Sequence, residues 1–132
     1  MAKKELLSGN IAMAEAAIRA GCNFFASYPI TPQTTLLEYM STRMYEVNRE
    51  FIQAESEISA INMVMGASAA GGRAMTATAG MAVSLMMETL SYLVAAKMPS
   101  VVINIQRTGA GAGGIKSSQT DYHYATKSMG HG

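Results

Sequence analysis

Two kinds of hydrophobic segment alternate along the chain. Short, almost continuous apolar runs are typical of buried strands, and longer segments in which apolar residues recur every three or four positions are typical of amphipathic helices. This pattern predicts strands over residues 24–28, 50–54, 74–78 and 101–105, and helices over 11–19, 32–44, 55–70 and 82–96. Strands that alternate with helices of this length are joined by right-handed crossovers. We therefore expect an α/β fold with three layers, an open parallel sheet covered by helices on both faces.

Local signals predict where the helices begin and which residues they bury. Ser8 or Asn10 can cap the first helix, and Gly21 stands where a left-handed residue would end it. Thr31 and Pro32 resemble a cap followed by proline at the first helical position, where the missing N–H does no harm. The second helix is predicted to bury Leu36, Leu37, Met40 and Met44. The third is predicted to place Ile58, Ile61, Met65 and Ala69 on one face. The fourth is predicted to turn Leu85, Met86, Leu90 and Leu93 inward. Residues 117–132 show no clear period.

Composition favours one domain that another subunit covers. The chain has 132 residues, and charged residues make up 14%, against about 25% in typical soluble domains. A net charge of +1 gives no field that would attract nucleic acid or an anionic membrane. No apolar run reaches the roughly 20 residues of a membrane span, and no signal-peptide core is present. The single cysteine, Cys22, cannot hold an iron–sulfur cluster. We expect a cytoplasmic chain that itself binds no metal, nucleic acid or membrane.

Candidate chemistry lies where the predicted strands end, because open parallel sheets bind ligands beside the carboxyl ends of their strands. Thr31 lies between two prolines, so its hydroxyl and the N–H groups of a helix start can meet an anion or a carbonyl; the simpler interpretation is a stiff turn. The side chains of Glu55 and Glu57 cannot point in the same direction. The simpler interpretation is that either one only interacts with the helix dipole. A functional role requires one of them to be buried beside a nitrogenous ligand. Arg107 is the cation best placed to meet a carboxylate, although a surface arginine or an ion pair is the usual case.

The glycine-rich segment 109–114 matches the G-x-G-x-x-G pattern of dinucleotide-binding domains. No amphipathic helix follows it, and the acidic residue expected about 20 positions later would lie beyond the last residue. An NAD(P)-binding domain therefore rests on this segment alone, and we interpret it instead as an open loop beside a ligand or a partner. Cys22 is expected in the core, and His123 and His131 are expected to face solvent or a partner.

Several motifs in order carry a family resemblance. They are Gly9-Asn10, Tyr28-Pro29-Ile30-Thr31-Pro32, Gln53-Ala54-Glu55-Ser56-Glu57, the run 60–67, Arg107, Gln119-Thr120-Asp121-Tyr122 and Gly130-His131-Gly132. Together they resemble the N-terminal part of the α-type subunit of 2-oxoacid:ferredoxin oxidoreductases. The residues of these motifs are most similar to those of the 2-oxoisovalerate branch. The resemblance implies a thiamine diphosphate-binding fold of the pyrimidine type over residues 1–132, incomplete at the C-terminus.

The resemblance also implies roles for individual residues. Glu57 matches the glutamate that hydrogen-bonds the cofactor pyrimidine and favours its imino tautomer, which is pKa tuning of a cofactor by a buried carboxylate. Thr31 and Arg107 match residues that meet the 2-oxo acid, and Pro29 and Ile30 would pack near the cofactor.

The implied reaction is oxidative decarboxylation of a 2-oxo acid, with the acyl group passed to coenzyme A and electrons passed to ferredoxin. A β-type subunit would hold the diphosphate and Mg²⁺, and iron–sulfur and γ-type subunits would carry the clusters. This activity would belong to a hetero-oligomer, so the isolated chain is expected to be inactive.

Two departures from the family pattern support an alternative. Ala79-Gly80-Met81-Ala82 stands where the family usually has Ser-Gly-Pro-Gly, and Gly109-Ala110 stands where it has Gly-Pro. These changes favour a catalytically silent assembly subunit, whereas the retained Thr31, Glu57 and Arg107 argue against it.

Overall fold

The computed structural model describes residues 4–107 and 118–127. Four parallel strands form one sheet in the order β2-β1-β3-β4, so the predicted parallel sheet is confirmed. The elements in chain order are α1 (Gly9–Arg19), β1 (Phe24–Ser27), α2 (Thr34–Glu46), β2 (Glu50–Gln53), α3 (Glu57–Ala69), β3 (Ala74–Ala79), the 3₁₀ helix η1 (Gly80–Met86), α4 (Met87–Ala95), β4 (Ser100–Ile105) and α5 (Thr120–Lys127).

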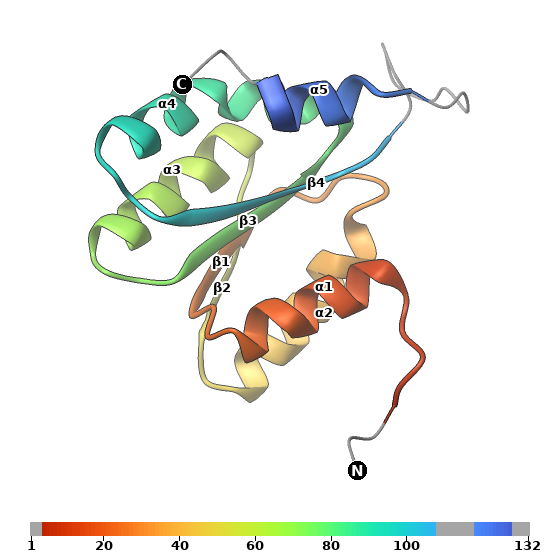
Figure 1. The fold of residues 1–132 in the computed structure, drawn as a ribbon. Coiled ribbons are helices and arrows are strands. Elements are labelled where there is room, and N and C mark those ends of the chain that lie inside the picture. Colours follow the sequence, from red (N-terminus) through yellow and green to blue (C-terminus); the bar gives the residue numbers. More distant parts are fainter. Residues whose placement is uncertain (1–3, 108–117, 128–132) are drawn as a thin grey trace.

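Helices cover the two faces of the sheet (Figure 1). α1 and α2 lie on one face, and α3, α4 and α5 lie on the other, which confirms the three-layer arrangement. Within the described ranges, no helix is long and apolar enough to cross a lipid bilayer.

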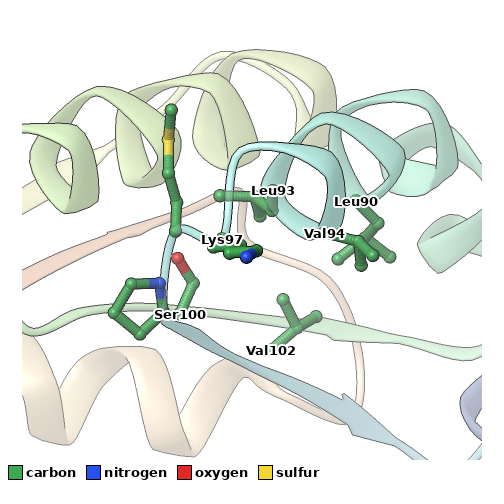
Figure 2. Close-up of a pocket in the computed structure, with 8 residues that line it drawn as sticks. Leu90, Leu93, Val94, Lys97, Ser100 and Val102 are labelled. Carbon is green, nitrogen blue, oxygen red and sulfur yellow. The ribbon is translucent and has the colours of Figure 1, made fainter.

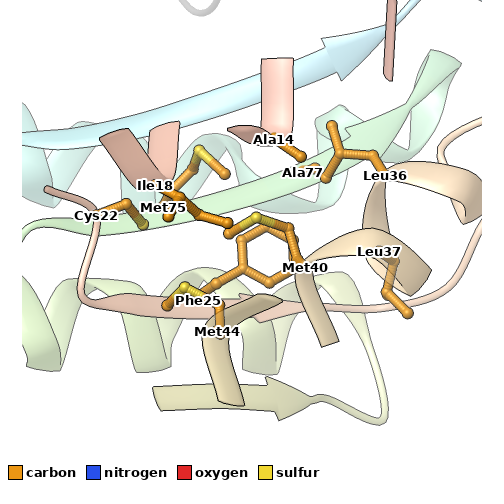
Figure 3. Close-up of a cluster of buried hydrophobic side chains, with 10 residues drawn as sticks. All are labelled: Ala14, Ile18, Cys22, Phe25, Leu36, Leu37, Met40, Met44, Met75 and Ala77. Carbon is orange, nitrogen blue, oxygen red and sulfur yellow. The ribbon is translucent and has the colours of Figure 1, made fainter. Parts of the chain in front are cut away.

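The core beneath α1 and α2 follows the predicted pattern (Figure 3). The apolar face of α2 is buried as its spacing predicts. Phe25 of β1 also stacks on Phe51 of β2, with ring centroids 5.9 Å apart. Cys22 is a buried core residue, and desolvation raises the pKa of its thiol. The buried members of this cluster are Ala14, Ile18, Cys22, Phe25, Leu36, Leu37, Met40, Met44, Met75 and Ala77.

The opposite core corrects the predicted face of α3. Ile58, which we expected to face inward, is 51% exposed, and Ala69 is also exposed. The side of α3 that packs on the sheet is formed by Glu57, Ala60, Ile61, Val64 and Ser68. Since α3 carries no charged residue after Glu57, its sequence had little polar contrast to indicate the buried side.

The segment after β3 is not the continuous α-helix predicted over 82–96. Gly80–Met86 forms a 3₁₀ helix, and α4 begins only at Met87. The buried residues of η1 are Gly80, Val83 and Met86, the three-residue spacing of a 3₁₀ helix, so Leu85 is turned outward and is 50% exposed.

A further helix, α5, lies in the region where the sequence showed no period. It packs against η1 and β4. Its exposed residues include His123, as predicted. The segment 109–114, the Gly109-Ala110 pair, His131 and Gly130-His131-Gly132 lie outside the described residues.

Candidate functional site

The predicted site residues emerge where the strands end, at what we call the carboxyl edge of the sheet. Thr31 follows β1, Glu57 follows β2, and Arg107 follows β4. Because all four strands are parallel, these residues leave the sheet at the same edge. β1 is central whereas β2 and β4 are the outer strands, so Thr31 and the end of β3 lie between the other two.

The segment 28–33 is a turn and not the start of a helix. The predicted cap at Thr31 and first helical position at Pro32 are wrong, because α2 begins at Thr34. The buried Gln33 closes the turn before α2 begins. Its backbone N–H donates to the Ile30 carbonyl at 2.8 Å, and its side-chain Nε2 donates to Ser27 Oγ at 2.9 Å. Thr31 is exposed, and within the described part of the chain no partner binds its hydroxyl.

Two further hydrogen-bonding residues fix this turn to its surroundings. Ser27 Oγ donates to the Ala77 carbonyl of β3 at 2.6 Å, so Gln33, Ser27 and β3 form a buried chain of hydrogen bonds. From α1, Asn10 Nδ2 lies 2.8 Å from the Pro32 carbonyl and 2.7 Å from Thr35 Oγ1. Asn10 therefore holds the turn, and the cap of α1 is Ser8. Sequence reasoning did not identify Gln33, because a glutamine after a proline carries no signal of burial.

The structure separates the two candidate carboxylates. Ser56 caps α3, with its Oγ accepting from the Ser59 N–H at 3.1 Å, and this cap puts Glu57 in the first turn of the helix. Glu57 is 6% exposed, and its carboxylate has no hydrogen-bond or ion-pair partner among the described residues. Glu55 is exposed and accepts a hydrogen bond from the Ser59 hydroxyl, which lowers the pKa of Glu55. Glu57 is therefore the buried, unpaired acid that a nitrogenous ligand requires.

Arg107 is a half-buried cation whose guanidinium is unpaired. Every other arginine of the chain has a protein partner: Arg19 and Arg43 pair with Glu15, and Arg49 and Arg73 donate to backbone carbonyls. In residues 4–107 and 118–127, no acceptor binds the Arg107 guanidinium.

The backbone beside Arg107 is held by a residue that sequence reasoning had not given a role. Asp121 is 5% exposed, and its Oδ2 accepts from the Arg107 N–H at 2.6 Å. The spacing Ser118-Gln119-Thr120-Asp121 resembles a capping box at a helix start, and this signal could have revealed both α5 and its buried acid.

Below the carboxyl edge lies a pair of unsatisfied polar side chains. Thr78 of β3 and Asn104 of β4 are neighbours in the sheet register. The Thr78 hydroxyl and both polar atoms of Asn104 are buried and have no partner among the described residues, as is the hydroxyl of Thr76. Such groups cost stability in the absence of a water or another partner.

Among the described residues, Glu57 fits the pyrimidine ring of thiamine diphosphate, the cofactor that the family resemblance implies. Glu57 supplies a buried acceptor without a protein partner, which suits a protonated ring nitrogen. Within residues 4–107 and 118–127, no group of three His, Cys, Asp or Glu side chains could hold a metal ion.

Two hollows of the surface lie away from this edge. One, of about 710 Å³, is lined by residues of α1 and by the starts of β3 and β4. The other, of about 310 Å³, lies between α4 and β4, and Figure 2 shows Leu90 and Val94 on one side with Ser100 and Val102 on the other. Both lie toward the amino ends of the strands, where open parallel sheets do not place their ligands.

Comparison with known proteins gives consistent matches. The family model described as "Pyruvate flavodoxin/ferredoxin oxidoreductase, thiamine diP-bdg" matches residues 15–130. The chain is 44% identical to the ketoisovalerate oxidoreductase subunit VorB of Methanothermobacter thermautotrophicus over 128 residues, which is 97% of this chain and 36% of VorB. It is 47% identical to the 2-oxoglutarate synthase subunit KorA of Methanocaldococcus jannaschii over 111 residues, which is 84% of this chain and 30% of KorA.

A solved structure supports the fold. A 2-oxoglutarate:ferredoxin oxidoreductase from Magnetococcus marinus with 2-oxoglutarate, coenzyme A and succinyl-CoA bound superposes with a TM-score of 0.85 at 36% identity. The match covers 96% of this chain and 22% of that one. The chain thus spans about a third of the length of the curated relatives described above, and less of the solved one.

Proposed function

The chain belongs to the pyruvate flavodoxin/ferredoxin oxidoreductase family of thiamine diphosphate-binding domains, and from this premise we propose that it forms the pyrimidine side of the active site of a 2-oxoacid:ferredoxin oxidoreductase. The proposed reaction converts a 2-oxo acid and coenzyme A into acyl-CoA and carbon dioxide and passes two electrons to ferredoxin. The relatives include subunits named for ketoisovalerate and for 2-oxoglutarate, so the proposed substrate class is 2-oxo acids in general.

The observation that carries this proposal is the state of Glu57. Glu57 as a residue is 6% exposed and its carboxylate has no partner within the described residues, so a protonated nitrogen of a ligand could bind it. In the proposed complex, Glu57 accepts a hydrogen bond from the pyrimidine ring. When bound, thiamine diphosphate supplies the nucleophilic carbon for decarboxylation.

Thr31 and Arg107 are proposed to hold the 2-oxo acid. Thr31 presents an exposed hydroxyl from a turn that is anchored to two strands, so it can donate to a carbonyl from a fixed position. The unpaired guanidinium of Arg107 can bind a carboxylate through two parallel hydrogen bonds. Pro29 and Ile30 of the same turn, both half-buried, are proposed to pack near the cofactor.

Apolar side chains exposed near the carboxyl edge support a site that a second polypeptide completes. Tyr28 is 36% exposed, Ile58 51%, Met81 40% and Leu85 50%. They belong to the segments that follow β1, β2 and β3, the same segments that carry Thr31 and Glu57 or adjoin them in the sheet. We propose that a β-type subunit covers them and carries the diphosphate and Mg²⁺ site, and that iron–sulfur and γ-type subunits pass the electrons to ferredoxin.

The test is reconstitution of the complex. The chain would be co-expressed with the products of neighbouring reading frames and purified through a tag on this chain. The assay measures reduction of a viologen dye that depends on both coenzyme A and a 2-oxo acid, with 2-oxoisovalerate and 2-oxoglutarate compared. Activity that Arg107→Gln lowers supports the proposal. A complex that turns over no 2-oxo acid, or whose activity is the same for Glu57→Gln and Arg107→Gln variants as for wild type, supports the silent assembly subunit instead.

A further inference from the structure

We propose that Asp121 is a positioning residue that fixes Arg107 for binding the carboxylate of the 2-oxo acid. This inference rests on the proposed function, and it adds a residue of α5 to a site otherwise built from segments that follow the strands. Asp121 acts through the backbone of Arg107, so it leaves the guanidinium free for the substrate.

The first support is the contact itself. Asp121 Oδ2 accepts from the Arg107 N–H at 2.6 Å, and the Asp121 side chain is 5% exposed. A hydrogen bond to an ionised acceptor is about twice as strong as one between neutral groups, and burial excludes competing water. Beside it, Gln106 Nε2 donates to the Ser118 carbonyl at 2.6 Å. Two consecutive residues after β4 are therefore tied to the start of α5.

The second support is the path of the Arg107 side chain. A Cβ atom built on Gly80 would lie 3.0 Å from Arg107 Cβ and 3.4 Å from its Cδ. Gly80 also has φ +62°, a conformation that favours glycine. The arginine stem thus passes directly over the Gly80 backbone, while Asp121 holds the peptide from which it starts. An arginine fixed at its root and unpaired at its end is preorganised for an anionic ligand.

The third support is the choice of acceptor. A carboxylate close to an arginine commonly pairs with the guanidinium, as the half-buried Glu15 does with Arg19 and Arg43. Asp121 instead binds the main chain of Arg107, and it lies in the first turn of α5, where the helix dipole stabilises its charge. Its negative charge is therefore satisfied without occupying the group that the substrate needs.

The experiment uses the reconstituted complex and four variants of this chain. Asp121→Ala removes the acceptor, Asp121→Asn keeps an acceptor of similar size, and Arg107→Gln removes the cation. Thr126→Ala is the matched control, because Thr126 Oγ1 donates only to the Tyr122 carbonyl within α5, at 2.7 Å. For each variant, kcat and KM for the 2-oxo acid are measured, together with the Kd for thiamine diphosphate in the presence of Mg²⁺.

Asp121→Ala is expected to lower kcat/KM for the 2-oxo acid by about 10- to 100-fold, mainly through KM, because a displacement of about 1 Å at a binding group has effects of this size. Cofactor Kd should change less than twofold, and Asp121→Asn should recover most of the loss. In the Arg107→Gln background, Asp121→Ala should have no further effect, because the group that it positions is gone.

Four results would overturn the inference. If Thr126→Ala reproduces the Asp121→Ala profile, or if Asp121→Ala weakens cofactor and substrate binding alike without rescue by Asp121→Asn, the role of Asp121 is only to dock α5. Should Arg107→Gln lower kcat/KM while both Asp121 variants leave it unchanged, the inference fails and the proposed function stands. Should Arg107→Gln itself have no effect, the proposed role of Arg107 is wrong and the inference falls with it. If Asp121→Ala does not fold, Asp121→Asn and the double variant with Arg107→Gln carry the comparison.

Discussion

Replacing Glu57 with glutamine should make the isolated chain more stable and the assembled enzyme inactive. The substitution keeps the size of the side chain and removes its charge. In the isolated chain, the Glu57 charge has no hydrogen-bond or ion-pair partner among the described residues, and the dipole at the start of α3 offsets only part of the cost of burying it. In the complex, the same charge is proposed to hold a protonated ring nitrogen. Opposite effects on stability and on turnover are expected of a residue retained for chemistry.

The size of the stability effect follows from burial. Leaving a buried polar group without a partner costs about 1–3 kcal/mol. Glu57 retains 6% exposure and the replacing amide is itself polar, so we take the low end, about 1 kcal/mol. For a chain of 132 residues this corresponds to a rise in Tm of about 3–5 °C. Thermal unfolding of the isolated chain, followed by circular dichroism at neutral pH, measures it.

The loss of turnover should be much larger. General acid–base contributions are typically about 10²–10⁴-fold, and Glu57→Gln in the reconstituted complex should lower kcat within this range while cofactor still binds. Proton exchange at the reactive carbon of bound thiamine diphosphate, followed by NMR, should slow by a similar factor. This exchange does not depend on the 2-oxo acid and so separates cofactor activation from substrate binding.

Glu55→Gln is the internal control. Glu55 is exposed and bonded to the Ser59 hydroxyl, so its replacement should neither raise Tm nor slow proton exchange. If the two substitutions behave alike, or if the Glu55 change is the more harmful to turnover, the wrong carboxylate has been assigned. A lower Tm for Glu57→Gln in the isolated chain would refute the inference that the carboxylate is unpaired.

Four further outcomes are expected. The isolated chain should not bind thiamine diphosphate with Mg²⁺ at sub-micromolar Kd in calorimetry, because it makes only part of the contacts. Thr78→Val should leave stability to urea unchanged or raise it by up to about 1 kcal/mol, since it removes an unsatisfied hydroxyl. Ser27→Ala should lower it by about 1–2 kcal/mol, because Gln33 and a β3 carbonyl lose their shared partner. Hydrogen bonds from Arg19 and Tyr39 lower the pKa of Glu15 below its ordinary 4.5. The stability that these bonds confer is therefore present above pH 4.5 and is lost as the pH falls further. Glu15→Gln should remove this acid sensitivity, which urea titrations at several pH values would measure.

Most of the sheet and one helical layer could be predicted from the sequence. The apolar runs mark strands because a parallel sheet is buried on both faces, and α2 has polar residues between its apolar ones, so its buried side is unambiguous. α3 lacks that contrast, and the hydrophobicity of Ile58 pointed to the wrong side. α5 is polar almost throughout, so no hydrophobic period could reveal it.

The carboxyl edge shows why site residues are harder to predict than elements. Glu55 and Glu57 are chemically identical in the sequence, and only the point at which α3 begins decides which of them is buried. Thr31 was expected to start a helix, but hydrogen bonds from Gln33 hold Thr31 in a turn instead. Glutamine is not a residue that predicts a turn, so nothing in the sequence indicated this. The capping-box spacing can place Asp121 at the start of α5, but it does not reveal that its carboxylate binds the backbone N–H of Arg107.

The 3₁₀ geometry of η1 also sets a length. A 3₁₀ helix rises about 2.0 Å per residue and an α-helix about 1.5 Å, so a segment the size of η1 is about 3.5 Å longer than it would be as α-helix. η1 joins the end of β3 directly to α4, and at its start Gly80 supports the Arg107 stem. Conversion of even one turn to α-helix would draw that support away from the arginine while leaving the sheet register untouched. The segment η1 therefore sets the spacing between β3 and α4. Substitutions within η1 that favour α-helix are expected to displace the Arg107 side chain without touching it.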